Sequence, residues 1–255
     1  MHVNAADWTK SASQEGDPAP RPSRRSSNAS SMPMSVRAVL FDIDGTLIDS
    51  NDFHVLAWQQ AFREHGIELS SDRVHAQIGK GADMLIPALA PIADAKERES
   101  IDKRHGEIFA TEYLPRTKPF RCAPELLRTL HGSGLTLVLA SSAAHKEIDH
   151  YIELLQASSL LAATTSGDDV TRTKPAADIF AVALRKIAPI TQHEAIAIGD
   201  SPYDAESAGK CALRTIGVRS GGFADEKLNE AGVIAIYDDA CDLLKNLASS
   251  PVLTG

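Results

Sequence analysis

Short apolar runs alternate with helical patterns along most of the chain, and turn signals separate them. Residues 36–41 form an apolar run that ends abruptly at two acids, which is typical of a buried strand. Similar runs follow at residues 135–140, 161–165, 195–198, 213–218 and 233–237. Helical periods separate these runs. The pattern therefore predicts an α/β fold with a doubly wound, mostly parallel, Rossmann-like sheet and right-handed crossovers.

Residues 51–118 differ from the rest because they show helical periods only. Phe53, Leu56 and Phe62 recur at helical spacing, and Gly66 suits the end of that helix. Further helices are expected over residues 71–78, through 84–89 and over 94–113. We therefore expect an all-helical cap subdomain at 51–118, inserted into an α/β core domain made of residues 35–50 and 119–255.

Residues 1–34 are rich in serine, proline and arginine and hold almost no periodic apolar residues. Such a composition cannot bury enough apolar surface to offset the entropy of ordering, so a disordered tail is predicted. The segment has no apolar core of the kind that a secretory signal needs.

Composition narrows the possible partners and the compartment. The net charge of −8 argues against a nucleic-acid partner, and no apolar run approaches the length of a membrane span. Cys122, Cys211 and Cys241 are far apart and form neither a metal knuckle nor a disulfide framework. We therefore expect reduced, packed thiols and a cytoplasmic location. No protein partner can be inferred.

The first predicted strand ends in the acids Asp42 and Asp44, which are followed by Gly45. Alternation along a continued strand would direct both carboxylates the same way. Two carboxylates so close repel each other unless a cation lies nearby. The alternative is a surface turn, for which Asp-Gly is a common signal.

Three later segments place further polar residues at the same predicted edge. Ser141–Ser142 follow the second strand and suit an anion site, or else an ordinary helix cap. Lys174, before a proline at the expected start of a helix, would place an ammonium there, although most lysines are merely solvated. Asp200 and Asp204 follow the fourth strand and suit Mg²⁺, unless they only cap a helix.

Taken together, these motifs resemble those of the haloacid dehalogenase superfamily, in its phosphatase and β-phosphoglucomutase branch with a helical cap. The matching segments are residues 42–46, Ser141, Lys174 and residues 199–204. The dehalogenase branch lacks a second acid in the first motif, so Asp44 indicates phosphoryl transfer.

The resemblance implies a role for each of these residues. Asp42 would attack phosphorus to form an aspartyl-phosphate, and Asp44 would be the general acid and base. Mg²⁺ would be held by Asp42, by the backbone carbonyl of Asp44 and by Asp200, with Asp204 close by. The phosphoryl oxygens would be bound by Ser141 and Lys174. Thr46 and Ser142 are further substrate-binding candidates.

The expected cap offers two more candidates for substrate binding. The family's mutases carry a similar histidine at the place of His54, and Lys80 lies in a Gly-Lys-Gly turn. A partly buried histidine and a solvated lysine are the alternative interpretations. The mutases also carry an arginine four residues after that lysine, where this chain has Met84.

These observations predict an Mg²⁺-dependent phosphatase that acts on a small phosphorylated metabolite. A sugar-phosphate mutase is the alternative, although Met84 weakens it because a second phosphate would lack a fork-shaped cation. A phospho-aspartate signalling domain is a more distant alternative, since it would need neither a cap nor Asp44 as a proton shuttle. A silent binding module fits least, because all four polar motifs are intact.

Overall fold

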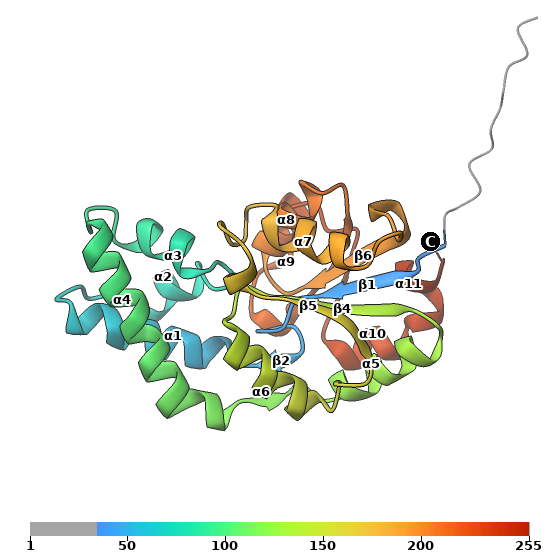
Figure 1. Ribbon diagram of the computed structural model, residues 1–255, viewed down its shortest axis with the longest axis horizontal. Coiled ribbons are helices and arrows are strands. Elements are labelled where there is room, and N and C mark those ends of the chain that lie inside the picture. The colour runs from blue at the N-terminus through green and yellow to red at the C-terminus, as the bar shows by residue number, and fades with distance from the viewer. Residues whose placement is uncertain (1–34, 255) are drawn as a thin grey trace, which may run out of the picture. The chain divides into compact units, whose positions relative to one another are not determined.

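The computed structural model describes residues 35–254, and the predicted tail at 1–34 lies outside the described residues. Its centre is a six-stranded sheet in which all neighbouring strands are parallel (Figure 1). In spatial order the strands are β5 (Leu161–Thr165), β4 (Thr136–Ala140), β1 (Ala38–Phe41), β6 (Ala195–Gly199), β7 (Arg214–Val218) and β8 (Ala235–Tyr237). This confirms the predicted doubly wound α/β fold.

Alternation along the buried strands divides the core between the two faces of the sheet. In β1, Val39 and Phe41 join one apolar cluster, whereas Ala38 and Leu40 join another. The first face is covered by α5 (Ala123–Gly132), α6 (His145–Leu155) and α10 (Ala240–Lys245). The second is covered by α7 (Asp178–Lys186) and α8 (Pro202–Gly209). The chain also forms α9 (Asp225–Glu230) and α11 (Pro251–Thr254).

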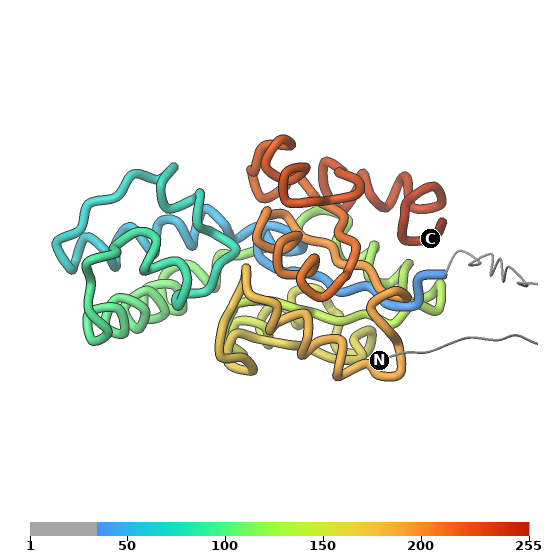
Figure 2. The backbone as a smooth tube through the Cα atoms, turned by 90° about the horizontal axis from the view of Figure 1, so that it is seen from above, coloured from blue at the N-terminus to red at the C-terminus, as the bar shows by residue number. Residues whose placement is uncertain are grey.

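Residues 51–116, between β1 and α5, are mostly helical, as the sequence pattern predicts. They contain α1 (Asn51–Glu64), α2 (Ser71–His75), α3 (Ala82–Leu89) and α4 (Ala95–Ile108). A π-helical turn, Phe109–Tyr113, continues α4. These helices share an apolar core of their own, which includes Trp58 and Phe62. They lie beyond the end of the sheet at which β1 finishes, as Figure 2 also shows. We call residues 51–116 the helical segment.

A short antiparallel ribbon marks the two points where the chain passes between the core and the helical segment. Its strands are β2 (Ile48–Asp49) and β3 (Lys118–Pro119). Two-residue strands are too short to give a periodic pattern, so this ribbon has no signature in the sequence.

The expectation that all three cysteines are reduced is wrong, because Cys122 and Cys241 form a disulfide. Cys122 immediately precedes α5 and Cys241 lies in α10, and the two helices pack together on one face of the sheet. Their Cα atoms are therefore 5.1 Å apart despite a sequence separation of 119 residues. Spacing in sequence carries no information about such a contact. Cys211 is free.

The expected helix start at Pro175 is also wrong. Residues 173–176 form a turn in which the Ala176 amide donates to the carbonyl of Thr173, and α7 begins only at Asp178. The Lys174–Pro175 peptide is cis. Lys174 therefore projects from a loop rather than from a first helical turn.

Among the described residues, no helix is both long enough and apolar enough to cross a membrane.

Candidate active site

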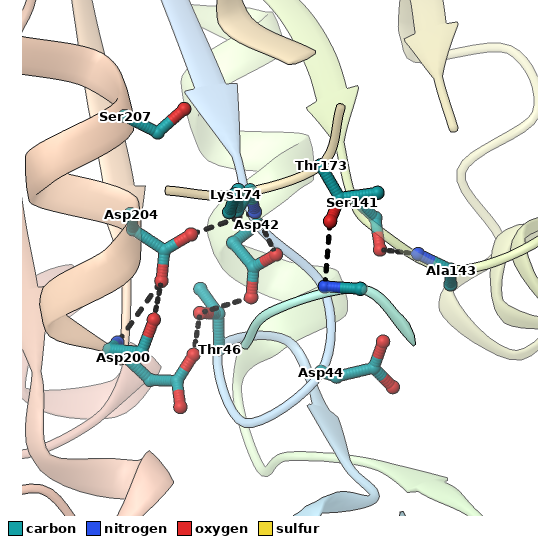
Figure 3. Close-up of polar contacts among 12 residues, drawn as sticks. Asp42, Asp44, Thr46, Ser141, Ala143, Thr173, Lys174, Asp200, Asp204 and Ser207 are labelled. Carbon is teal, nitrogen blue, oxygen red and sulfur yellow. Dashed lines mark hydrogen bonds and ion pairs between the residues drawn. The ribbon is translucent and has the colours of Figure 1, made fainter. Parts of the chain in front are cut away.

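The predicted polar residues meet at the carboxyl edge of the sheet, beside the central strand β1. Asp42 follows β1, Ser141 follows β4 on one side, and Asp200 follows β6 on the other. The chain crosses from one side of β1 to the other here, which is where doubly wound sheets bind their ligands. Figure 3 shows these side chains converging from separate strands.

Lys174 lies at the centre of this group and is fully buried. Its ammonium contacts Asp42 Oδ1 and lies 2.7 Å from Asp204 Oδ1 (Figure 3). Burial alone would lower the pKa of Lys174, but Asp204 and Asp42 outweigh it, so the net effect is to raise that pKa. Lys174 is therefore a fixed positive charge at neutral pH.

Three buried carboxylates, those of Asp42, Asp200 and Asp204, surround a single point. Each offers one oxygen that lies within 4.8 Å of the others. Burial, followed by repulsion from Asp204, raises the pKa of Asp42 to about 7, and burial and Asp42 raise the pKa of Asp200 well above its ordinary value. One ammonium does not neutralise three carboxylates. Hard oxygen ligands with excess negative charge fit a divalent cation such as Mg²⁺.

Two side chains and a glycine hold this cluster of three carboxylates in place. The Thr46 hydroxyl lies 3.2 Å from Asp42 Oδ2 and 3.1 Å from Asp200 Oδ1, and Asn51 Nδ2 donates to Asp200 Oδ2 at 3.0 Å. Gly45 has a φ of +77°, and a Cβ there would lie 2.3 Å from both Asn51 Nδ2 and Asp200 Oδ2. Only glycine fits this turn. From the sequence alone, Asn51 resembles an ordinary first residue of a helix. Nothing in the sequence indicates that its side chain contacts Asp200.

The side chain of Asp44 lies apart from these carboxylates and is held by Ser50 and by His54 of the helical segment. Its Oδ1 accepts a hydrogen bond from Ser50 Oγ at 2.6 Å and lies 3.2 Å from His54 Nε2. Burial opposes both charges, but the mutual attraction of the pair lowers the pKa of Asp44 and raises that of His54. The pair therefore favours an ionised carboxylate and a protonated imidazole.

His54 and a second histidine, His105, are held by aromatic stacking. The His54 ring stacks on Phe109 with centroids 3.8 Å apart, and the His105 ring stacks on Trp58 at 3.7 Å. Burial and the neighbouring His54 keep the pKa of His105 well below its ordinary value. A neutral His105 can accept from His54 Nδ1, which lies 3.5 Å away. Nothing in the sequence distinguishes His105, which lies within a polar helix.

Ser141, Ser142, His54 and Lys80 all line one cavity of about 370 Å³, which Asp42 and Asp44 also border. Ser141 Oγ is buried and accepts from the Ala143 amide at 3.0 Å, while Ser142 Oγ is buried without a partner among the described residues. Lys80 Nζ donates to Gln77 Oε1 at 2.6 Å. Thr46 does not border this cavity, since its hydroxyl lies among the carboxylates.

Hydrogen bonds attach the helical segment to the core around this cavity. The Asp83 carboxylate accepts from the Thr173 amide at 3.1 Å and also contacts its hydroxyl, which in turn accepts from the Gly81 amide at 2.9 Å. On the other side, His75 Nε2 lies 2.9 Å from the carbonyl oxygen of Gly221. Thr173, the residue before Lys174, is therefore hydrogen-bonded directly to the helical segment.

The fold and the site together define a doubly wound α/β protein with a cluster of buried carboxylates, able to hold a cation, at the carboxyl edge of its sheet. The chain belongs to the haloacid dehalogenase-like hydrolase family, whose model matches residues 39–218. It is therefore a hydrolase, as its motifs predict.

Individual relatives agree with this assignment. The chain is 30% identical over 228 residues to the chloroplastic protein SUPPRESSOR OF QUENCHING 1 of Arabidopsis thaliana; the match covers 86% of this chain but only 21% of the plant protein. It is 26% identical to a phosphoglycolate phosphatase of Salmonella typhi, with 84% of this chain and 93% of that protein covered. A hydrolase from Pseudomonas syringae has a similar structure, with a TM-score of 0.78, 28% identity, and 83% and 98% of the two chains covered.

Proposed function

We propose that this protein is an Mg²⁺-dependent phosphatase that hydrolyses a small phosphorylated metabolite through an aspartyl-phosphate intermediate. The observation that carries the proposal is the buried ammonium of Lys174 against Asp42. A carboxylate at the ligand edge of a sheet, paired with a fixed cation, can attack a phosphoryl group whose negative charge would otherwise repel it. A relative that is a phosphoglycolate phosphatase supports the same reaction class.

In the first half of the reaction, an Asp42 oxygen attacks phosphorus and the bond from phosphorus to the alcohol oxygen breaks. The resting pair of Asp44 and His54 holds one proton, which lies on His54. This proton passes from His54 to Asp44 and from Asp44 to the leaving oxygen. This role fits the position of Asp44, whose side chain borders the cavity instead of joining the other carboxylates.

In the second half, Asp44 removes a proton from water, the water oxygen attacks phosphorus, and the bond from Asp42 to phosphorus breaks. Ser141 and Lys174 hold the phosphoryl oxygens during both steps, with Ser142 beside them. The helical segment acts as a cap that excludes bulk water and through His54 and Lys80 contacts the alcohol part of the substrate.

Asp42, Asp200 and the backbone carbonyl of Asp44 are the proposed Mg²⁺ ligands, with Asp204 close by. When bound, the ion neutralises the phosphoryl oxygens and the carboxylates together. The raised pKa values of Asp42 and Asp200 support this proposal, since both carboxylates lack sufficient positive charge in the protein alone.

Asp42→Asn tests the proposal with p-nitrophenyl phosphate and Mg²⁺. We expect turnover to fall by at least about 10³-fold, because an amide cannot form the intermediate. Asp49→Asn is the matched control, since Asp49 lies in β2 a few residues away and is exposed. Acid quenching of the unaltered enzyme followed by mass spectrometry should find a phosphoryl adduct on Asp42. Undiminished turnover by Asp42→Asn would refute the assignment.

A sugar-phosphate mutase is the second candidate, favoured by the contact of His54 with Asp44 and opposed by Met84. Incubation with β-glucose 1-phosphate and a bisphosphate primer separates the two. Free phosphate released faster than glucose 6-phosphate supports the phosphatase, and the reverse supports the mutase. A phosphoenzyme that persists for minutes would instead support a signalling role.

A cytoplasmic location also stays a prediction. The Cys122–Cys241 disulfide removes one of its supports, because disulfides are rare in a reducing cytosol. Alkylating free thiols inside intact cells, and then counting the alkylated cysteines of this protein by mass spectrometry, would test it. Three free thiols support a reducing compartment, and one free thiol opposes it.

A further inference from the structure

His105 has no part in the function proposed above, yet it lies where the helical segment meets the cavity. It belongs to α4, borders the cavity and is only 8% exposed. Its ring stacks on Trp58, with the ring centroids 3.7 Å apart and the planes 5° from parallel. Its Nε2 lies 3.5 Å from His54 Nδ1. His105 is therefore a buried polar ring in contact with the residue that pairs with Asp44.

The two ring nitrogens of His54 face different partners. Nε2 lies 3.2 Å from Asp44 Oδ1, and Nδ1 faces His105. Stacking on Phe109, with centroids 3.8 Å apart, fixes the plane of the His54 ring. It does not fix which edge faces Asp44, because half a turn about the Cβ–Cγ bond keeps the plane and exchanges each nitrogen for a carbon. The hydrogen bonds at the two nitrogens must therefore select the orientation.

The state of His105 suits it to accept a hydrogen bond from His54. Burial, together with the neighbouring His54, keeps the pKa of His105 well below its ordinary value, so its ring is neutral at pH 7. A neutral imidazole has one nitrogen that accepts. Within residues 35–254, His54 Nδ1 has no hydrogen-bond partner other than His105 Nε2. Without this acceptor, a buried N–H group of His54 would be left unsatisfied, which is costly.

The acceptor matters when the leaving oxygen is protonated. As His54 passes its Nε2 proton to Asp44, the ring keeps the proton on Nδ1, where His105 accepts it. The Nε2 lone pair then still faces Asp44 and can take a proton back in the second half of the reaction. A ring rotated by half a turn would present a carbon to Asp44 and could do neither.

We propose that His105 is a positioning residue for leaving-group protonation: its Nε2 accepts from His54 Nδ1–H and thereby holds His54 Nε2 against Asp44. This inference rests on the proposed phosphatase function and deepens it. Stacking on Trp58 keeps the acceptor in place. Because His105 acts through His54 and not on the phosphoryl group, its loss should matter most for alcohols that need a proton in order to leave.

Two substitutions separate the hydrogen bond from the packing of the ring. His105→Phe keeps an aromatic ring beside Trp58 and removes the acceptor. His105→Gln loses the ring but carries an amide oxygen with nearly the reach of Nε2. If the ring only fills space, the phenylalanine variant should be the more active one. If the ring accepts from His54, the glutamine variant should be.

The test measures kcat/KM with Mg²⁺ for phenyl phosphate and p-nitrophenyl phosphate, two esters of similar shape. This ratio reports the steps up to departure of the phenol. p-Nitrophenolate is a stable anion that leaves without a proton, whereas phenolate is more basic and leaves faster when protonated. We expect His105→Phe to lower kcat/KM by about tenfold or more for phenyl phosphate but by about threefold or less for p-nitrophenyl phosphate. His105→Gln should retain most of both activities.

His65→Phe is the matched control, because His65 is a histidine of the same helical segment that does not border the cavity; its ring nitrogens face the Ala61 carbonyl and Ser100 Oγ. It should hydrolyse both esters as the unaltered protein does. An unchanged ratio of the two esters in His105→Phe, or a larger loss in His105→Gln, would overturn the inference and leave the phosphatase assignment intact. If the unaltered protein hydrolyses neither ester, the phosphatase function fails, and this inference with it.

A measurement on the unaltered protein tests the hydrogen bond directly. NMR of the protein with isotope-labelled histidine should show a proton on His54 Nδ1 that exchanges slowly with water, because His105 accepts it in a buried site. A His54 ring without a proton at Nδ1 at neutral pH would overturn the inference even if both His105 variants fail to fold.

Discussion

Replacing Lys174 by methionine tests whether one buried ammonium holds the carboxylates of the site together. Methionine preserves most of the length and volume of the side chain and removes only the charge. Lys174 is fully buried and contacts both Asp42 and Asp204. Its removal leaves these carboxylates and Asp200 buried and uncompensated. Breaking a buried pair by deleting one partner lowers the free energy of unfolding by about 3–5 kcal/mol.

Urea unfolding at pH 7.5 without divalent ions measures this effect. With an m-value of about 3 kcal/mol per molar, the midpoint should fall by about 1 to 1.7 M. Added Mg²⁺ should restore part of the loss, because a cation that binds only the folded carboxylates stabilises that state. Phosphatase activity should be lost in the same variant.

Lys186→Met is the control, because Lys186 is one-third exposed and lies 2.9 Å from Asp169 Oδ2. Such a surface pair contributes less than about 1 kcal/mol. If the Lys174 and Lys186 variants lose the same small amount of stability, or if Mg²⁺ does not stabilise Lys174→Met, then Lys174 is not the counter-charge of these carboxylates.

Three further predictions follow from the geometry. Breaking the Cys122–Cys241 bond by Cys241→Ser should lower the free energy of unfolding by about 3–5 kcal/mol, and a reducing agent should have the same effect on the unaltered protein in thermal melts. The pKa of Asp42 is raised from 3.8 to about 7, so its ionisation opposes folding by about 4 kcal/mol above pH 7. The metal-free protein should therefore gain stability as the pH falls from 8 toward 5, and saturating Mg²⁺ should remove that gain; a flat metal-free profile would contradict this. Gly45→Ala should weaken Mg²⁺ binding in calorimetric titrations and destabilise the fold by at least about 1 kcal/mol, whereas Gly134→Ala, also at positive φ but in open space, should leave Mg²⁺ binding unchanged.

The parts of the site that could be predicted are those carried by strand ends. A parallel sheet brings the carboxyl ends of its strands to one edge, so Asp42, Ser141 and Asp200 meet there whatever the loops between them do. Apolar runs and turn signals located those ends to within one or two residues. Lys174 was placed at the same edge, but on a helix start that the structure replaces with a loop.

The parts that could not be predicted depend on contacts between distant segments. Asn51 reaches Asp200 only because Gly45 allows the chain to turn tightly beneath them. His105 meets His54 through the packing of α4 against α1, and nothing in a polar helix distinguishes it. Cys122 and Cys241 pair because two helices share a face of the sheet. Local patterns specify elements, whereas these pairings arise from how the elements pack.

The disulfide also separates the proposed catalytic groups into two parts of the backbone. Residues 122–241 form a covalently closed ring that contains Ser141, Lys174, Asp200 and Asp204. Asp42 lies outside it. A protease that cuts one exposed loop within the ring leaves both pieces joined through sulfur, so the nicked chain migrates as one species until it is reduced. A cut between Asp42 and Cys122, in contrast, leaves the proposed nucleophile attached to the rest of the site by noncovalent contacts alone.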